Sequence, residues 1–266
     1  MKLKSFFPEI LRTLAMVLAV CLFAAACASK DDGGDFDDDG GDDFGYELPD
    51  DNDPLETPNR FIFAVNDALD TLVFQPVAAT YRFLLPEFAR NSVQSFFRNL
   101  RAPVNLANNL LQGDWEGAEQ TMGRFAINTS FGVLGLFDMA TDAGYPYREE
   151  DFGQTLGTYG VGEGFYLVLP IFGPSSLRDG TGRLVDWGLD PLSYILTFEE
   201  SIARRAIEGT DTRSRNIETI EALKADSIDF YARVRSLYRQ NREDEINNGR
   251  PAEEVPSPDF SSDEDS

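Results

Sequence analysis

The sequence predicts a mainly α-helical fold, built as a single domain between two disordered acidic tails. Apolar residues recur at helical spacing along the middle of the chain, and Pro and Gly divide that part into short segments. The strict alternation that is typical of strands is rare. The middle part spans about 190 residues, which is enough for one domain with a sizeable core.

The first residues carry the features of an export signal. Basic residues precede an apolar run from Leu11 to Ala26 that ends in small side chains, so we predict a signal peptide over residues 1–26. The end of this run, AAAC, resembles a lipobox that lacks the usual Leu, and it predicts lipidation at Cys27. The alternative is an ordinary cleavage near residue 26 with Cys27 incidental. A lone cysteine without a disulfide partner in an exported chain favours lipidation.

Most of the net charge of −23 lies in the tails. Residues 31–53 hold twelve acidic and no basic side chains, and residues 243–266 hold nine acidic side chains and Arg250. We predict an acidic, flexible tether over residues 27–52 and a disordered acidic tail over residues 247–266. Nothing resembles a basic stripe, so nucleic acid is not an expected partner.

The residue types exclude several catalytic classes. The chain has no histidine, which removes Ser-His-Asp and Cys-His nucleophile systems and every His-ligated metal site. Ser175 and Ser176 lack the G-x-S-x-G context, and the glycines do not match phosphate-binding spacings. We predict neither a metal nor a cofactor. A hydrolase that uses carboxylates such as Glu149 and Glu150 is an alternative, although adjacent acids in a turn are more often a solvated bend.

The helical domain is predicted over residues 53–246. Asp53 is placed to cap its first helix, with Glu56 at the spacing that closes a capping box. Pro76 and then Pro86 are predicted to break and redirect the chain.

Proline and glycine also divide the next part of the chain. Two further helices are predicted after Pro86, separated near Pro103 and stopped by Gly113. Asp114 is placed to cap the helix that follows.

The last part of the domain mixes glycine-rich and helical segments. Residues 152–174 predict a glycine-rich loop or a short β-hairpin, followed by a helix near residues 176–187. Ser176 and Asp179 stand at capping-box spacing, and Arg178 with Asp179 is interpreted as a structural pair or cap. A long helix with one narrow apolar stripe is predicted from about Asp211 to Glu245.

Five segments, in order, resemble the MlaA family, also called VacJ, whose members are outer-membrane phospholipid-handling lipoproteins of Gram-negative bacteria. The resemblance covers residues 52–240. The segments are NDPLETPNRFIFAVN (52–66), APVNLANNLLQGD (102–114), RFAINTSFGVLGLFD (124–138), FGQTLGTYGVGEGFYLVLPIFGPSSLRD (152–179) and DPLSYI (190–195).

The resemblance implies a monomeric, ring-like domain of short amphipathic helices that lies in the inner leaflet of the outer membrane. It implies an amphipathic channel through which mislocalised phospholipids leave the outer leaflet and pass to a periplasmic lipid-binding shuttle. It also implies association with trimeric porins and no covalent chemistry, so the chain is not expected to be an enzyme. The alternative is a lipid-anchored periplasmic scaffold without a transport path.

Polar positions in otherwise apolar helices are the candidate lining of such a channel, because burying a lipid headgroup in hydrocarbon is costly. The candidates are Asn59, Arg60, Asn66, Asn105, Asn108, Asn109, Arg124 and Asn128. For each Asn, a cap or a satisfied structural hydrogen bond is the alternative. The glycines of the 157–164 segment are candidates for a channel mouth or hinge, or for a plain turn: Gly157, Gly160, Gly162 and Gly164.

Overall fold

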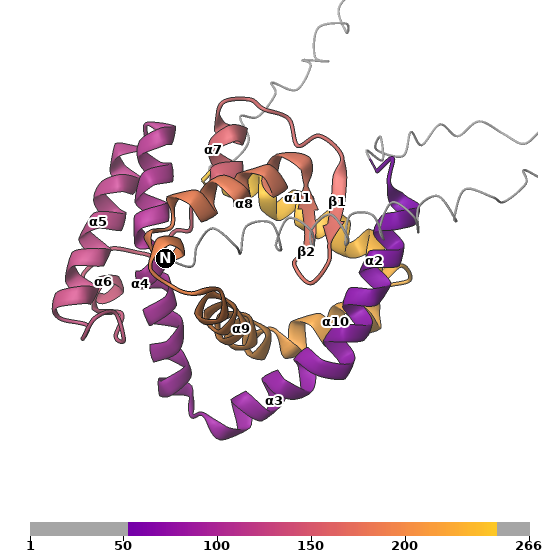
Figure 1. Ribbon diagram of the computed structural model, residues 1–266, viewed down its shortest axis with the longest axis horizontal. Helices are drawn as coiled ribbons and strands as arrows, with labels where there is room; N and C mark the ends of the chain where they lie inside the picture. The colour runs from indigo at the N-terminus through magenta and orange to yellow at the C-terminus, as the bar shows by residue number, and fades with distance from the viewer. Residues whose placement is uncertain (1–52, 249–266) are drawn as a thin grey trace, which may run out of the picture.

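The computed structural model describes residues 53–248, in which helices follow one another around a ring (Figure 1). The predicted mainly α-helical, ring-like fold is confirmed. Cys27, the predicted signal peptide, the predicted tether up to residue 52 and residues 249–266 of the predicted tail lie outside the described residues.

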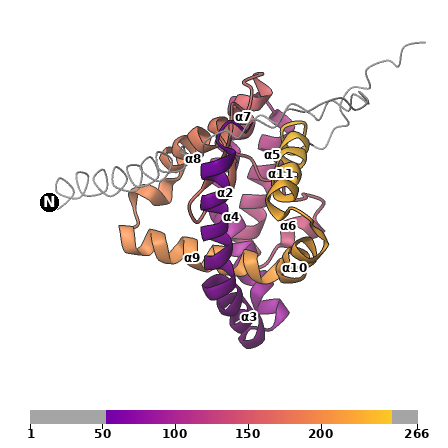
Figure 2. The same cartoon turned by 90° about the vertical axis from the view of Figure 1, so that its right-hand side faces the viewer.

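The first side of the ring is one continuous helical segment, Glu56–Leu84, of 29 residues. It consists of α2 (Glu56–Leu69), a π-helical stretch η1 (Asp70–Phe74) and α3 (Gln75–Leu84). Figure 2 shows α2 and α3 along the side of the ring. Among the described residues this is the one helix that is long and apolar enough to cross a membrane, by length and composition alone, and 6% of its apolar window is buried.

Two predictions about this segment are wrong. Pro76 does not break the helix, because the turn before it widens: the N–H of Gln75 donates to the carbonyl of Asp70, five residues earlier. The wider turn accommodates the ring of a proline, which clashes with the preceding turn of a regular α-helix. Asp53 does not cap α2, whose first turn has no side-chain cap. Its carboxylate is used elsewhere in the ring.

The opposite side of the ring is formed by α4 (Glu87–Gln112), α5 (Trp115–Ser130) and the short α6 (Met139–Asp142). Pro86 separates α3 from α4, as predicted. Gly113 ends α4 with a φ of 74°, and the Asp114 carboxylate caps α5 by accepting from the N–H of Gly117 at 2.9 Å, also as predicted. The predicted separation at Pro103 is wrong: α4 runs through it, packed against α5, α7 and α9.

The chain then enters the ring as a hairpin. A short helix, α7 (Phe152–Thr158), precedes β1 (Tyr166–Leu169) and β2 (Gly173–Ser176), which pair antiparallel with Tyr166 opposite Ser176. The hairpin alternative for this segment is therefore confirmed. It leads into α8 (Leu177–Leu189) and a single 3₁₀ turn, η2 (Pro191–Tyr194).

Three helices, not one, complete the ring: α9 (Phe198–Arg215), α10 (Ile217–Asp226) and α11 (Phe230–Ile246). The prediction of one long helix from Asp211 is wrong. Asn216 separates α9 from α10, and extended backbone at Ser227 separates α10 from α11. Asp229 caps α11 by accepting from the N–H of Ala232 at 3.0 Å. At these two breaks the chain changes direction, so the three helices follow the ring (Figure 1).

The described part has a small hydrophobic core. Tyr166 and Val168 of β1 pack with Tyr231 of α11, against Phe63 and Tyr238. Among the described residues, nine apolar ones are buried, against twenty-one polar or charged ones. Hydrogen bonds and ion pairs therefore account for many of the contacts between buried side chains in the described part.

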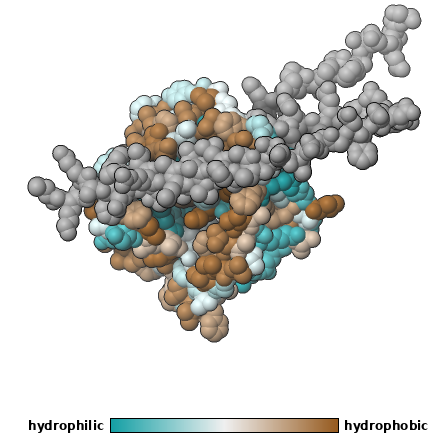
Figure 3. All heavy atoms as spheres, turned by 45° about the vertical axis from the view of Figure 1, so that its right-hand side comes forward, coloured by the Kyte–Doolittle hydropathy of each residue, from teal (hydrophilic) through white to brown (hydrophobic). Residues whose placement is uncertain are grey.

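Many large apolar side chains instead face outward. Phe83 on α3 is 88% exposed and Leu72 on η1 is 75% exposed, while Phe131 and Leu134 protrude beyond α5. Figure 3 shows broad hydrophobic areas interrupted by hydrophilic ones on one face. Exposure on this scale marks a surface that meets a membrane or a partner.

Candidate functional site

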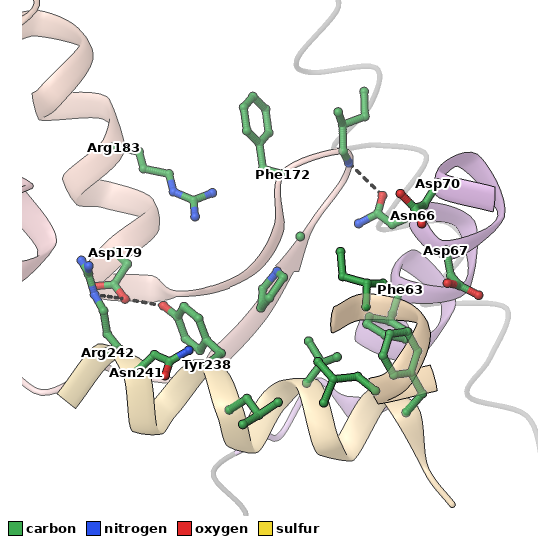
Figure 4. A pocket seen from close by; sticks show the side chains of 18 of the residues that line it. Phe63, Asn66, Asp67, Asp70, Phe172, Asp179, Arg183, Tyr238, Asn241 and Arg242 are labelled. Atoms are coloured by element: carbon green, nitrogen blue, oxygen red, sulfur yellow. Dashed lines mark hydrogen bonds and ion pairs between the residues drawn. The ribbon is translucent and has the colours of Figure 1, made fainter. Parts of the chain in front are cut away.

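A cavity of about 720 Å³ lies between the hairpin and the helices α2, η1, α7, α8, α10 and α11 (Figure 4). Its size falls within the range of roughly 300–1,000 Å³ that is common for ligand sites. The elements around it come from both ends of the described chain, so the cavity exists only because the ring closes.

The wall of the cavity has both apolar and charged parts. Apolar side chains come from α2, the hairpin turn and α11, among them Phe63, Phe172 and Leu237. Figure 4 shows one polar group on α8 and α11 and another on α2 and η1, with apolar side chains between them. A molecule with both a charged and an apolar part therefore matches this wall.

Asp179 is the centre of the polar group on α8 and α11. It is 4% exposed, and its carboxylate accepts from Arg178 Nε at 2.9 Å and from Arg242 Nη2 at 3.1 Å. The hydroxyl of Tyr238 donates to the same carboxylate. The backbone N–H of Asp179 donates to Ser176 Oγ at 3.1 Å, which caps α8. One carboxylate thus ties the start of α8 to α11.

Burial alone would raise the pKa of the Asp179 carboxyl. The hydrogen bond from Tyr238 and the positive charges of Arg242 and Arg178 outweigh burial, so the pKa lies below its ordinary value. Burial raises the pKa of Tyr238, and the bond to Asp179 raises it further. At neutral pH the wall therefore carries an ionised carboxylate and a neutral phenol.

The polar group on α2 and η1 faces α9 and α10. Asp70 accepts from Arg213 Nε at 2.6 Å, and Lys224 Nζ lies 2.5 Å from Asp67 Oδ1 and 3.6 Å from Asp70 Oδ2. These pairs join the first side of the ring to its last helices.

Asn66 holds the hairpin turn against α2. Its Nδ2 donates to the carbonyl of Leu169 at 3.0 Å, and its Oδ1 accepts from the N–H of Ile171 at 2.8 Å. Ile171 has a φ of 70°, a conformation that a β-branched residue rarely adopts. The amide of Asn66 therefore fixes a strained turn at the edge of the cavity.

The comparisons with known proteins agree with one another. Residues 51–245 match the model of the MlaA lipoprotein family. The chain belongs to the MlaA lipoprotein family. A protein of Escherichia coli K12, named intermembrane phospholipid transport system lipoprotein MlaA, is 38% identical over 202 residues, which are 74% of this chain and 79% of that protein.

Two further matches support membership of the MlaA family. A Rickettsia bellii protein, named only as uncharacterized, is 36% identical over 192 residues, 72% of this chain and 75% of its own length. A solved structure described as the structural basis for maintenance of bacterial outer membrane lipid asymmetry has a TM-score of 0.67 and 38% identity. The matched region covers 73% of this chain and 99% of the chain in that structure.

Of the eight polar residues that we predicted to line the channel of an MlaA-like ring, Asn66 lies on the wall of the cavity. Asn59 is buried beside it and joins α2 to β1: its Nδ2 donates to the carbonyl of Tyr166 at 2.9 Å, and its Oδ1 accepts from the N–H of Val168 at 3.0 Å. Arg60 pairs with Asp229 at 2.6 Å on the same side of the ring.

The other five lie on the α4 and α5 side of the ring. Asn108 and Asn109 are fully buried, and Asn108 donates to Asp186 Oδ1 at 2.9 Å. Asn105 donates to the carbonyl of Arg148 at 3.2 Å. These three amides join α4 to the segments around α7 and α8. They do not line the large cavity.

Arg124 and Asn128 of α5 both bind Asp138, which precedes α6. Arg124 Nη2 lies 2.8 Å from Asp138 Oδ2, and Asn128 Nδ2 lies 3.1 Å from Asp138 Oδ1. These bonds hold the apolar loop after α5 in place. For Asn128 this is the satisfied structural hydrogen bond that was the alternative interpretation, and Arg124 forms an ion pair of the same kind.

The four predicted hinge or mouth glycines lie beside the hairpin and outside the cavity lining. Gly157 packs so closely on α11 that an added Cβ would lie 2.7 Å from Ile246 Cδ1. Gly160 and Gly164 have φ values of 79° and 70°, which suit turns, and Gly162 has open space around it. A role at a channel mouth stays a prediction.

The sequence interpretation missed Arg183, Lys224 and Arg242, which carry the positive charges of the cavity wall. They lie on helices that look like ordinary surface helices with one apolar face. The Arg178–Asp179 pair at the start of α8 was one signal that could have been used. If Asp179 is buried, its carboxylate needs a cation from a second element as well. That element, α11, could not be placed from its sequence.

Proposed function

We propose that this MlaA family member removes mislocalised phospholipids from the outer leaflet of the outer membrane and passes them toward the periplasm. The cavity carries this proposal, since a headgroup needs polar contacts while acyl chains need apolar ones. Both kinds of wall surround one space of about 720 Å³. One relative is named for intermembrane phospholipid transport and the similar solved structure for outer-membrane lipid asymmetry, which supports the same function.

The outward-facing apolar side chains support a position in the bilayer. Short helices with exposed apolar faces can lie within one leaflet with limited depth. We propose that the ring lies in the inner leaflet of the outer membrane and that a lipid on Cys27 anchors it there. Trimeric porins and a periplasmic lipid-binding shuttle are the proposed partners, and the ring itself is proposed to be a monomer. No covalent step is part of this proposal.

Deletion of the gene in its host tests the proposal. Phospholipid that an added phospholipase can reach on intact cells should rise, and sensitivity to detergent should rise with it. The unaltered chain supplied from a plasmid should reverse both effects. An unchanged outer leaflet in the deletion strain would contradict the proposal.

A variant that fills the cavity sharpens the test. Val234 lines the cavity on α11, so Val234→Trp should fail to restore the outer leaflet. Ile202→Trp, on an exposed position of α9 outside the lining, is the matched control and should restore it. Equal restoration by both variants would mean that lipid does not pass through this space.

A further inference from the structure

The charged side chains on the cavity wall differ in whether they form ion pairs or hydrogen bonds within the protein. Six carboxylates line the cavity, and each has a cationic partner within 3 Å. The pairs are Asp67–Lys224, Asp70–Arg213, Glu149–Arg101, Asp151–Arg242, Asp179–Arg178 and Glu245–Arg242. Lys224 and Arg242 are used in these pairs. Within residues 53–248, Arg183 is the one charged lining residue for which we find no hydrogen bond or ion pair.

The local sequence offers Arg183 two carboxylates, and the structure uses both elsewhere. Asp179 stands four residues earlier on α8, the usual spacing for a helical ion pair. It is buried and shared by Arg178, Arg242 and Tyr238. Asp186, three residues later, accepts from Asn108 and from the N–H of Phe152. The guanidinium of Arg183 is therefore left facing the space of the cavity.

Arg183 also stands where a headgroup would meet acyl chains. Its side chain is exposed, and Figure 4 shows it extending from α8 toward the cavity, on the same side as Phe172 of the hairpin turn. A guanidinium presents a planar fork of donors that matches two oxygens of a phosphate. Phe172, which lines the same cavity, is 60% exposed and offers apolar contact.

We propose that Arg183 binds the phosphate of the lipid headgroup and that the cavity prefers phospholipids with net negative charge. A zwitterionic headgroup also carries a phosphate, but its ammonium needs a free carboxylate. Every lining carboxylate is already paired, so an ammonium would have to displace a cation from it. A headgroup that is a phosphate and neutral hydroxyls has no such requirement. This inference rests on the proposed function and names the lipid class that the cavity takes.

The test uses the full chain, exchanged against vesicles that contain equal amounts of phosphatidylethanolamine and phosphatidylglycerol. The lipid retained after repurification is extracted and quantified. The ratio of phosphatidylglycerol to phosphatidylethanolamine in the retained lipid should exceed that in the vesicles by about 3- to 10-fold, the range expected for one charge-assisted contact in a partly hydrated site. Arg183→Gln should abolish the enrichment while the total lipid retained stays close to that of the unaltered chain, and Arg183→Lys should keep part of it.

Arg205→Gln is the matched control, because Arg205 is exposed on α9 and outside the cavity lining. It changes the net charge by the same amount and should leave the enrichment unchanged. An equal fall in both Gln variants, or no fall in Arg183→Gln, would overturn the assignment of Arg183. Retention of lipid without any headgroup preference would overturn this inference alone, whereas retention of no lipid would overturn the proposed function as well.

Discussion

The two sides of the ring use polar side chains in opposite ways. On the α4 and α5 side, buried amides bind neighbouring segments, and the space left among them is about 20 Å³. On the hairpin side, charged pairs surround a cavity of about 720 Å³. The difference shows that a polar residue in an apolar helix marks a buried contact at least as readily as it marks a channel wall.

Side-chain length explains the difference. An asparagine side chain is short, so it holds segments in direct contact: Asn108 of α4 donates to Asp186 on α8, and Asn109 donates to Thr121 on α5. Arginine reaches further and can join elements that stay apart: Arg242 of α11 binds Asp151 before α7 and Asp179 on α8. Long ion pairs therefore leave room for a cavity that short amide bonds do not.

The largest effect should come from Asp53, on the hairpin side. Its carboxylate accepts from Arg235 Nη1 at 3.0 Å, from Asn59 Nδ2 at 2.8 Å and from the hydroxyl of Tyr231. Asp53→Ala removes the buried carboxylate that these three donors share, so the free energy of unfolding should fall by about 3–5 kcal/mol. Denaturant unfolding in detergent micelles measures this. Glu56→Ala removes an exposed partner of Arg60 and should cost at most about 1 kcal/mol.

The next effect tests the α4 side. Asn108→Ala removes the bonds to Asp186 and to the carbonyl of Val104, and it takes one of two acceptors from Thr155 Oγ1, which keeps the carbonyl of Asp151. The free energy of unfolding should fall by about 2–4 kcal/mol, since buried polar atoms lose their partners. Gln240→Ala, at an exposed position with one side-chain bond, should change it by less than about 1 kcal/mol. If Asn108→Ala instead loses lipid retention while its free energy of unfolding is unchanged, Asn108 would be assigned to the channel wall.

Acid should weaken the α5 side through Asp138. Burial alone would raise its pKa, but hydrogen bonds from Arg124, Thr141 and Asn128 lower it to about 2. A depressed folded-state pKa stabilises the fold above the unfolded value of about 4, and this stability is lost as pH falls toward 2. The loss should be about 2 kcal/mol at most. The free energy of unfolding, measured between about pH 5 and about pH 2, should depend less on pH in Asp138→Asn than in the unaltered chain. An identical profile in the two proteins would contradict this assignment.

The smallest effect on stability should come from Asn66. Its two bonds to the hairpin turn lie at the edge of the cavity, so Asn66→Ala should lower the free energy of unfolding by only about 1–2 kcal/mol. Lipid retention should fall more clearly than stability, because the turn that carries Phe172 loses its tie to α2. Retention that is unaffected by the loss of this tie would show that the turn does not shape the site.

The sequence allowed the fold class, the hairpin alternative and several boundaries to be predicted, because Pro86, Gly113 and Asp114 act through local backbone chemistry. It failed at Pro76 and Pro103, where tertiary packing and a widened turn keep the helix continuous. The cavity wall was largely missed, because it depends on which distant helices meet. Asn66 was found by its contrast with apolar neighbours, whereas arginines on an amphipathic helix show no such contrast.

The contact of Asp53 with Arg235 has a consequence for how the chain folds. The two residues are 182 positions apart, so almost the whole domain must be present before this contact forms. Contacts this distant in sequence are slow to form, because a long loop must lose its conformational entropy first. Because α4 and α5 are neighbours in the sequence, they can pair early as a local hairpin of helices. We therefore expect the cavity to form last, and an unfinished ring to expose its apolar faces until the final helix has packed.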